Sequence, residues 1–187
     1  MQETTKDERL GSERLGKLMV SLAVPAVAAQ LINVLYNIVD RIYIGHIQGY
    51  GDMALTGVGV TFPIIMLIAA FSAFAGMGGA PLASIQLGKH DYDRAELILG
   101  NSAGLLVIFS VVLTIGFSIF KTPVLYAFGA SETTIQYAES YIGIYLLGTI
   151  FVQFAVGLNT FISGQGEARI AMLSVLIGAI INICLDP

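Results

Sequence analysis

Charged residues divide the chain into long uncharged runs of mostly apolar residues. These runs cover residues 18–39, 53–88, 97–120, 140–166 and 170–185. A helix needs about 20 residues to cross the hydrocarbon core of a membrane, which is about 30 Å thick. The pattern therefore predicts five membrane-spanning helices with short connections, over about 18–44, 53–82, 97–120, 138–162 and 168–187. The apolar core of a signal peptide has about 7–15 residues. The first run is longer, so we expect this segment to be retained as a membrane span.

Composition supports a membrane environment and excludes several classes of protein. Hydrophobic residues make up 56% of the 187 residues, and charged residues make up 12%, about half the usual share of a soluble domain. A chain this apolar is not disordered, and a net charge of −4 does not suit nucleic-acid binding. Cys184 is the single cysteine, and His46 and His90 are far apart in the sequence. We therefore expect no internal disulfide, no zinc site and no cofactor.

The distribution of basic residues predicts how the chain lies in the membrane. Cytoplasmic loops are enriched in Lys and Arg. With a cytoplasmic amino terminus, seven of the nine Lys and Arg residues fall inside, and Arg41 and Lys121 fall outside. We therefore expect residues 1–17 to form a charged cytoplasmic tail, followed by a transmembrane bundle over 18–187. Five spans then place Pro187 at the outer face, directly after a helix, and we expect the chain to be a fragment.

The first predicted span contains a stripe of polar side chains. Its members are Gln30, Asn33, Asn37 and Asp40, which fall within an arc of roughly 80° at 100° per residue. Polar groups in a membrane are costly and usually face a bundle interior or a water-filled cavity. One interpretation is that the stripe lines a cavity and ends in a titratable carboxylate. The other is that Asp40 only marks the point where the helix leaves the membrane.

The fifth predicted span ends with a second pair of polar residues, Asn182 and Asp186. The first and fifth helices run in the same direction, so Asp40 and Asp186 lie toward the same side of the membrane. Carboxylate and amide oxygens suit a small cation, and two nearby carboxylates can share a proton. Asp186 precedes a proline, however, and such a pair also ends helices.

Four further features of the spans are candidates for moving, packing or anchoring elements. Pro25 cannot donate a hydrogen bond to its helix, so we expect it to bend or loosen the first span. Asn159 is predicted either to join helices or to line a cavity. Glycines such as Gly76, Gly100 and Gly104 are expected to let helices approach closely. Tyrosines at the start of the fourth span are expected to anchor it at the membrane interface, although Tyr145 could reach the interior.

Five segments of the sequence carry a further signal. They are VPAVAAQLINVLYNIVDRIYIG (24–45), ALTGVGVTFP (54–63), QLGKHDYDRAELILGNS (86–102), FISGQGEARIAM (161–172) and NICLDP (182–187). These segments resemble the multidrug and toxic compound extrusion family of bacterial transporters. Their order and spacing match the family through nearly the whole chain after the tail.

This resemblance implies an all-α membrane protein whose five transmembrane helices form most of the amino-terminal six-helix lobe of a two-lobe transporter. It implies a location in the bacterial inner membrane. It also implies the function of a multidrug antiporter that works by alternating access. Such an antiporter would export cationic or amphipathic compounds in exchange for Na⁺ or H⁺. Asp40, Asn182 and Asp186 would hold the coupling proton or Na⁺. Asn33, Tyr36 and Asn159, with Asn37 from the polar stripe, would line the cavity, and Pro25 would bend the helix. The expected partners are membrane lipid, drug or toxin substrates and the missing carboxy-terminal lobe, with no nucleic acid.

Other functions remain open at this point. An intramembrane aspartyl protease would use two carboxylates, but the chain has no Gly-x-Gly-Asp motif. A lipid-linked oligosaccharide flippase of related fold would need basic residues for a pyrophosphate, and the five uncharged runs have none. A truncated remnant that does not transport is the remaining alternative. The sequence favours a transporter over an enzyme.

Overall fold

The computed structural model describes residues 15–185 and builds them as six helices with short connections. The helices are α2 (Leu15–Gly45), α3 (Gly51–Gly88), α4 (Tyr92–Ala127), α5 (Ile135–Leu147), α6 (Thr149–Gly164) and α7 (Ala168–Leu185). Two connections turn through glycines with positive φ, Gly49 at 89° and Gly166 at 83°, a conformation that suits a residue without Cβ. The described part of the chain is therefore all-helical, as predicted.

Four of these helices are long and apolar enough to cross a membrane by themselves. The predicted fourth span is instead divided between α5 and α6, which meet at Gly148 with a bend of 60°. Counting this bent pair as one span gives five. The predicted third span ends at about residue 120, whereas α4 continues through Pro123 to Ala127. Leu125 is fully buried there, in the main apolar core, and this packing extends the helix.

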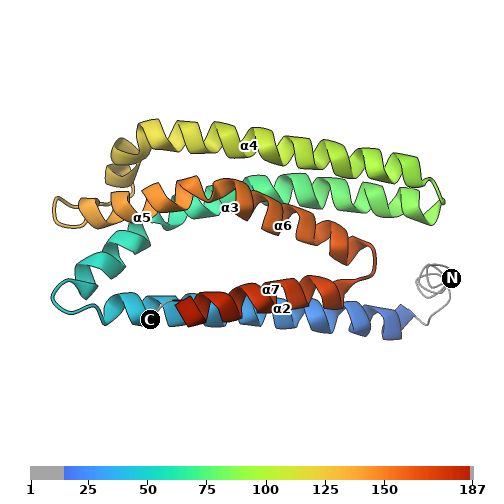
Figure 1. The fold of residues 1–187 in the computed structure, drawn as a ribbon, viewed down its shortest axis with the longest axis horizontal. Helices are drawn as coiled ribbons and strands as arrows, with labels where there is room; N and C mark the ends of the chain where they lie inside the picture. The colour runs from blue at the N-terminus through green and yellow to red at the C-terminus, as the bar shows by residue number, and fades with distance from the viewer. Residues whose placement is uncertain (1–14, 186–187) are drawn as a thin grey trace.

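The helices form two groups, with α3 at the centre of the larger one. Helix α3 packs against α4, α5 and α6, whereas α2 packs mainly against α7. Figure 1 shows α2 and α7 side by side and running in the same direction, set apart from α3 and α4. Contacts of α6 with α7 and of α2 with α3 join the groups. The structure thus brings together the two helices that carry the polar residues singled out in the sequence.

The main apolar core lies between α3, α4 and α5. Its largest buried side chains include Ile64, Ile68 and Ile142, and Phe71 meets Phe109 edge to face with ring centroids 4.9 Å apart. Next to this core, the buried Ser72 donates a hydrogen bond to Gln153 Oε1 across 2.7 Å. Burying a polar group is costly unless it has a partner, so this bond lets α3 and α6 bury two polar side chains.

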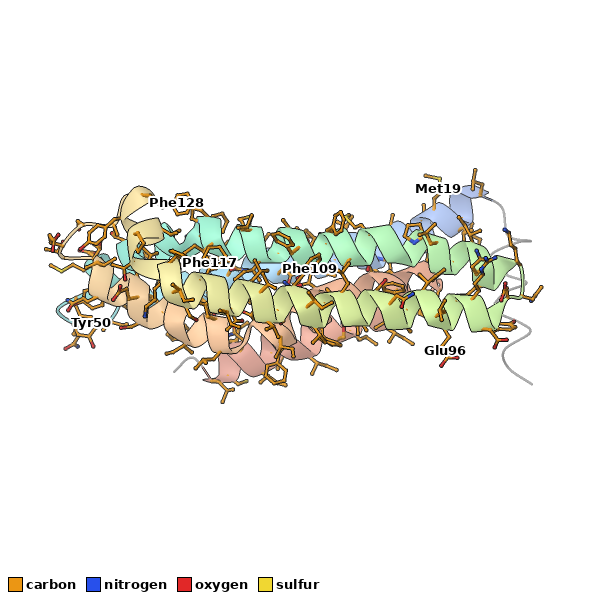
Figure 2. The ribbon with its side chains drawn as sticks, turned by 90° about the horizontal axis from the view of Figure 1, so that it is seen from above. Met19, Tyr50, Glu96, Phe109, Phe117 and Phe128 are labelled. Atoms are coloured by element: carbon orange, nitrogen blue, oxygen red, sulfur yellow. The ribbon has the colours of Figure 1, made fainter. Side chains whose placement is uncertain are left out.

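Large apolar side chains cover much of the outer surface of the bundle. Leu147, Phe151 and Leu185 are each more than 75% exposed, and Figure 2 shows side chains projecting outward along the whole bundle. Such continuous apolar surface exceeds what a soluble monomer presents, and it suits contact with lipid tails. Together with the four or five candidate spans, it identifies a multi-pass membrane protein.

Glycines determine how closely α3 approaches α6. A Cβ at Gly76 would lie 2.5 Å from Thr160 Oγ1 and 2.6 Å from the Gly157 carbonyl oxygen. Gly100 and Gly104 differ from the expectation, because a Cβ at either would meet no described atom within 4 Å. These two glycines lie on a side of α4 that faces away from its contacts with the other described helices. Close approach through glycine is therefore found where α3 meets α6 and also where α3 meets α5, since a Cβ at Gly57 would lie 2.9 Å from Tyr137 Cβ.

We predict that Gly76→Ala destabilises the protein by about 1–3 kcal/mol, because the new methyl group would overpack the interface against backbone. Gly78→Ala is the matched control, since a Cβ there meets nothing within 4 Å and alanine favours helix by about 1 kcal/mol. Thermal unfolding in detergent should show a lower midpoint for Gly76→Ala only. Equal midpoints for the two variants would contradict the packing described.

Candidate functional site

A cavity of about 1090 Å³ lies between α2, α3, α5 and α7. Its volume slightly exceeds the range of about 300–1,000 Å³ that is typical of small-molecule sites. Helices α2, α5 and α7 contribute polar side chains to its lining, and α3 contributes apolar ones. The polar lining residues are Gln30, Asn33, Tyr36, Asn37, Asp40, Arg41, Tyr43, Tyr141, Tyr145 and Asn182.

The polar stripe of α2 forms one side of this cavity. All four stripe residues predicted from the helical period line it. Asn37 Nδ2 donates a hydrogen bond of 2.7 Å to the carbonyl oxygen of Asn33, one helical turn earlier. This bond directs the Asn37 amide along the helix and leaves its Oδ1 as an acceptor toward the cavity. Helix periodicity therefore located one wall of the site from the sequence alone.

Asp40 and Asn182 bring a carboxylate and an amide to the same cavity from two helices. Both residues line it, and both are half-buried. The Oδ1 atom of each is inaccessible to solvent. The packing of α7 alongside α2 produces this juxtaposition of residues far apart in sequence. Asp186, the third predicted member of the cation site, lies outside the described residues.

Two tyrosines of α5 complete the wall opposite α2. Tyr141 and Tyr145 line the cavity, and Tyr141 is close enough to both Asp40 and Arg41 for their charges to act on its hydroxyl group. The sequence analysis expected these tyrosines to anchor the fourth span at the membrane interface and left open that Tyr145 reaches the interior. That role suits Tyr137 better, which stacks on Tyr50 with ring centroids 5.8 Å apart, at one end of the bundle (Figure 2).

The apolar wall of the cavity was not predicted. It is formed by α3, through Val58, Phe62, Ile65 and Met66. These residues stand in an uncharged run with few polar side chains, so no periodic signal distinguishes the cavity side from the lipid side. An apolar wall facing amides and tyrosine hydroxyls suits an amphipathic organic molecule.

Asn159 occupies a different position from the one implied by the family resemblance. The described residues that line the cavity do not include it. Its Nδ2 donates hydrogen bonds to the Ala171 carbonyl oxygen at 3.2 Å and to Ser174 Oγ at 2.9 Å. Both partners belong to α7, so this amide joins α6 to α7. The alternative of an interhelical contact is the one found in the structure.

Pro25 is buried within α2, which is a continuous helix from Leu15 to Gly45. Proline lacks the N–H that would bond the carbonyl oxygen of residue 21. The backbone ladder is therefore weakened about a turn and a half before the polar stripe. A change of helix direction at this point would move Asp40 relative to α7, and the sequence expectation of bending stays a prediction.

Comparison with known proteins gives a consistent match. The MatE family model matches residues 25–187. The multidrug export protein MepA of Staphylococcus haemolyticus is 27% identical over 185 residues, which cover 97% of this chain and 40% of that protein. Solved structures of MATE in complex with MaD3S and in the bent conformation match with TM-scores of 0.87 and 0.86, at 29% and 27% identity. They cover 97% and 100% of this chain, and 40% of each solved chain. The chain thus spans about two fifths of the length of these relatives.

We predict that water reaches the α2 wall of the cavity but not the lipid-facing side of the same helix. In a Cys184→Ser background, Asn37→Cys should react with a charged thiol reagent, because thiols need water to ionise. Leu35→Cys is the control, since Leu35 is 60% exposed but does not line the cavity. It should react only after denaturation. Equal labelling of both cysteines in the folded protein would contradict this assignment.

Proposed function

The chain belongs to the MatE family of multidrug efflux transporters, and we propose that it forms the amino-terminal lobe of a cation-coupled multidrug antiporter. The match covers most of the chain, and the chain covers about 40% of its relatives. In this proposal the remaining lobe completes the passage through the membrane, and residues 1–17 lie in the cytoplasm. The exported compounds would be drugs, as the name of the relative, multidrug export protein MepA, suggests, and we propose that they are cationic or amphipathic.

The observation that supports coupling is the meeting of Asp40 and Asn182 at one cavity. A carboxylate and an amide oxygen are hard ligands that suit Na⁺, and the carboxylate alone suits H⁺. Among the described residues, no cluster of three or more His, Cys, Asp or Glu side chains suits a transition metal. We propose that Asp40 and Asn182, with Asp186, hold the coupling ion, and that the ion is cargo of the transport cycle.

Exchange would follow from competition between this ion and the substrate for one cavity. If the cation lowers the affinity for substrate, linkage requires the substrate to lower the affinity for the cation by the same factor. Alternating access requires in addition a helix that changes position. We propose that α2 does so at Pro25, where its hydrogen-bond ladder is weakened, and thereby changes the distance between Asp40 and α7.

The cavity does not favour the competing functions. A lipid-linked oligosaccharide flippase would need several cationic groups for its pyrophosphate, and Arg41 is the one Lys or Arg among the described residues that line the cavity. A remnant that does not transport would have no need for a polar cavity within a membrane, where such groups are costly.

We predict that Asp40→Asn in the complete transporter abolishes efflux of a cationic dye while leaving expression in the membrane intact. The substitution keeps the size of the side chain and removes its charge, so coupling is lost and packing is retained. Asp52→Asn is the matched control, because Asp52 lies in the first turn of α3 outside the cavity lining. Dye efflux from cells or proteoliposomes is the measurement. Near-normal efflux by Asp40→Asn at equal expression would refute the coupling role.

A further inference from the structure

The part of the cavity wall that α5 forms depends on the break between α5 and α6. Tyr141 and Tyr145 of α5 line the cavity, and the bend of 60° at Gly148 sets the direction of α5 relative to α6. A continuous helix through this point would carry α5 along the axis of α6. Because α6 packs against α3, the bend determines where the two tyrosines lie.

The backbone at the break departs from the regular pattern of an α-helix. The Gly148 N–H donates to the Tyr145 carbonyl oxygen at 3.0 Å, three residues back, and to the Ile144 carbonyl oxygen at 3.4 Å. The Phe151 N–H donates to the Gly148 carbonyl oxygen at 3.0 Å, again three residues back. Carbonyl groups at the end of a helix need partners outside its regular ladder, and the interior of a membrane provides no water for this purpose.

Thr114 of α4 supplies such a partner. Its Oγ1 donates a hydrogen bond of 3.2 Å to the carbonyl oxygen of Leu146, the penultimate residue of α5. Leu146 is 2% exposed, so the bond lies in the interior of the bundle. Thr149 Oγ1 donates to the Tyr145 carbonyl oxygen at 3.4 Å, but from within the broken pair itself. Thr114 therefore joins the end of α5 to a neighbouring helix.

We propose that Thr114 is a positioning residue of the cavity, because it holds the bend between α5 and α6 and so keeps Tyr141 and Tyr145 opposite α2. This inference rests on the proposed function and adds a residue that lies outside the described cavity lining. Thr114 acts only through the backbone of α5. Valine has nearly the same shape but no hydroxyl donor, so Thr114→Val removes this partner from the Leu146 carbonyl oxygen.

The loss of this bond is large enough to measure. Leaving a buried acceptor without its donor shifts an equilibrium by about tenfold. Affinity falls in proportion to the fraction of molecules in the binding-competent conformation. We therefore expect the Thr114→Val transporter to bind substrate about fivefold more weakly than the unsubstituted transporter. Thr114→Ser keeps the hydroxyl group and should bind substrate normally.

The first measurement reports the bend and needs no substrate. In the complete transporter with its cysteines replaced by serine, spin labels are attached at Gln136 and Gln165, which are exposed near the two ends of the α5–α6 pair. Straightening this pair would lengthen the distance between the labels by about 5 Å, which pulsed electron paramagnetic resonance resolves. We expect longer distances in Thr114→Val. Ser110→Ala is the matched control and should change nothing, because Ser110 Oγ is also buried on α4 but has no hydrogen-bond partner among the described residues.

The second measurement is the affinity of the purified complete transporter for tetraphenylphosphonium, a monovalent organic cation. If Thr114 acts through the two tyrosines, its effect should not add to theirs. Thr114→Val should weaken binding about fivefold by itself, but less than about twofold in a Tyr141→Ala/Tyr145→Ala background. A general loss of stability would weaken binding equally in both backgrounds.

The role of Thr114 is overturned if Thr114→Val leaves either the distance or the affinity unchanged, or if Ser110→Ala has the same effect. It is also overturned if Thr114→Ser behaves like Thr114→Val, or if binding weakens equally in both tyrosine backgrounds. Should Thr114→Val not fold, Thr114→Ala removes the same hydroxyl group and is held to the same outcomes. Failure of the unsubstituted transporter to bind tetraphenylphosphonium would contradict the proposed function, whereas an unchanged distance in Thr114→Val would overturn the role of Thr114 alone.

Discussion

The cost of polar side chains in a membrane is the constraint on which the rest of this structure depends. Helix α2 carries three amides and a carboxylate within a span that lipid would otherwise surround, and the fold brings them to one cavity. Each such group is stable only beside a partner or water. Three features of the fold meet that requirement. Helix α2 pairs with α7, this pair lies apart from α3 and α4, and the tyrosines of α5 face the polar side of α2. Function is therefore located where the burial cost would otherwise be highest.

The division of the bundle into tight and open regions follows from side-chain size. Helices α3 and α6 approach closely because Gly76 leaves room for the backbone of Gly157, and Ser72 and Gln153 bond across the same interface. At the cavity, by contrast, Phe62, Met66 and the two tyrosines of α5 hold α3 and α5 away from α2. The close-packed α3–α6 interface resists rearrangement, whereas the cavity leaves space beside α2. This contrast suits a transporter lobe in which α2 moves while α3 to α6 stay fixed.

Helical periodicity and hydropathy predicted the features that depend on one helix at a time. The polar stripe of α2 is such a feature, because its members share a face whatever surrounds the helix. The break at Gly148 was not predicted, since glycine is common within membrane helices and no proline or charged residue stands beside it. Positions that depend on the contact between helices were missed or left open. Tyr141 faces the cavity only because α5 lies opposite α2, and only the hydrogen bonds of Asn159 to α7 decide between its two predicted roles.

The central claim is that Asp40 and a cationic substrate compete through one cavity. It is tested most directly by titrating a monovalent organic cation into the purified complete transporter over a series of Na⁺ concentrations and pH values. The account predicts that rising Na⁺ or falling pH weakens binding, and that Asp40→Asn makes the affinity independent of the coupling ion. Binding that responds to neither Na⁺ nor pH, or that responds equally in Asp40→Asn, would contradict it.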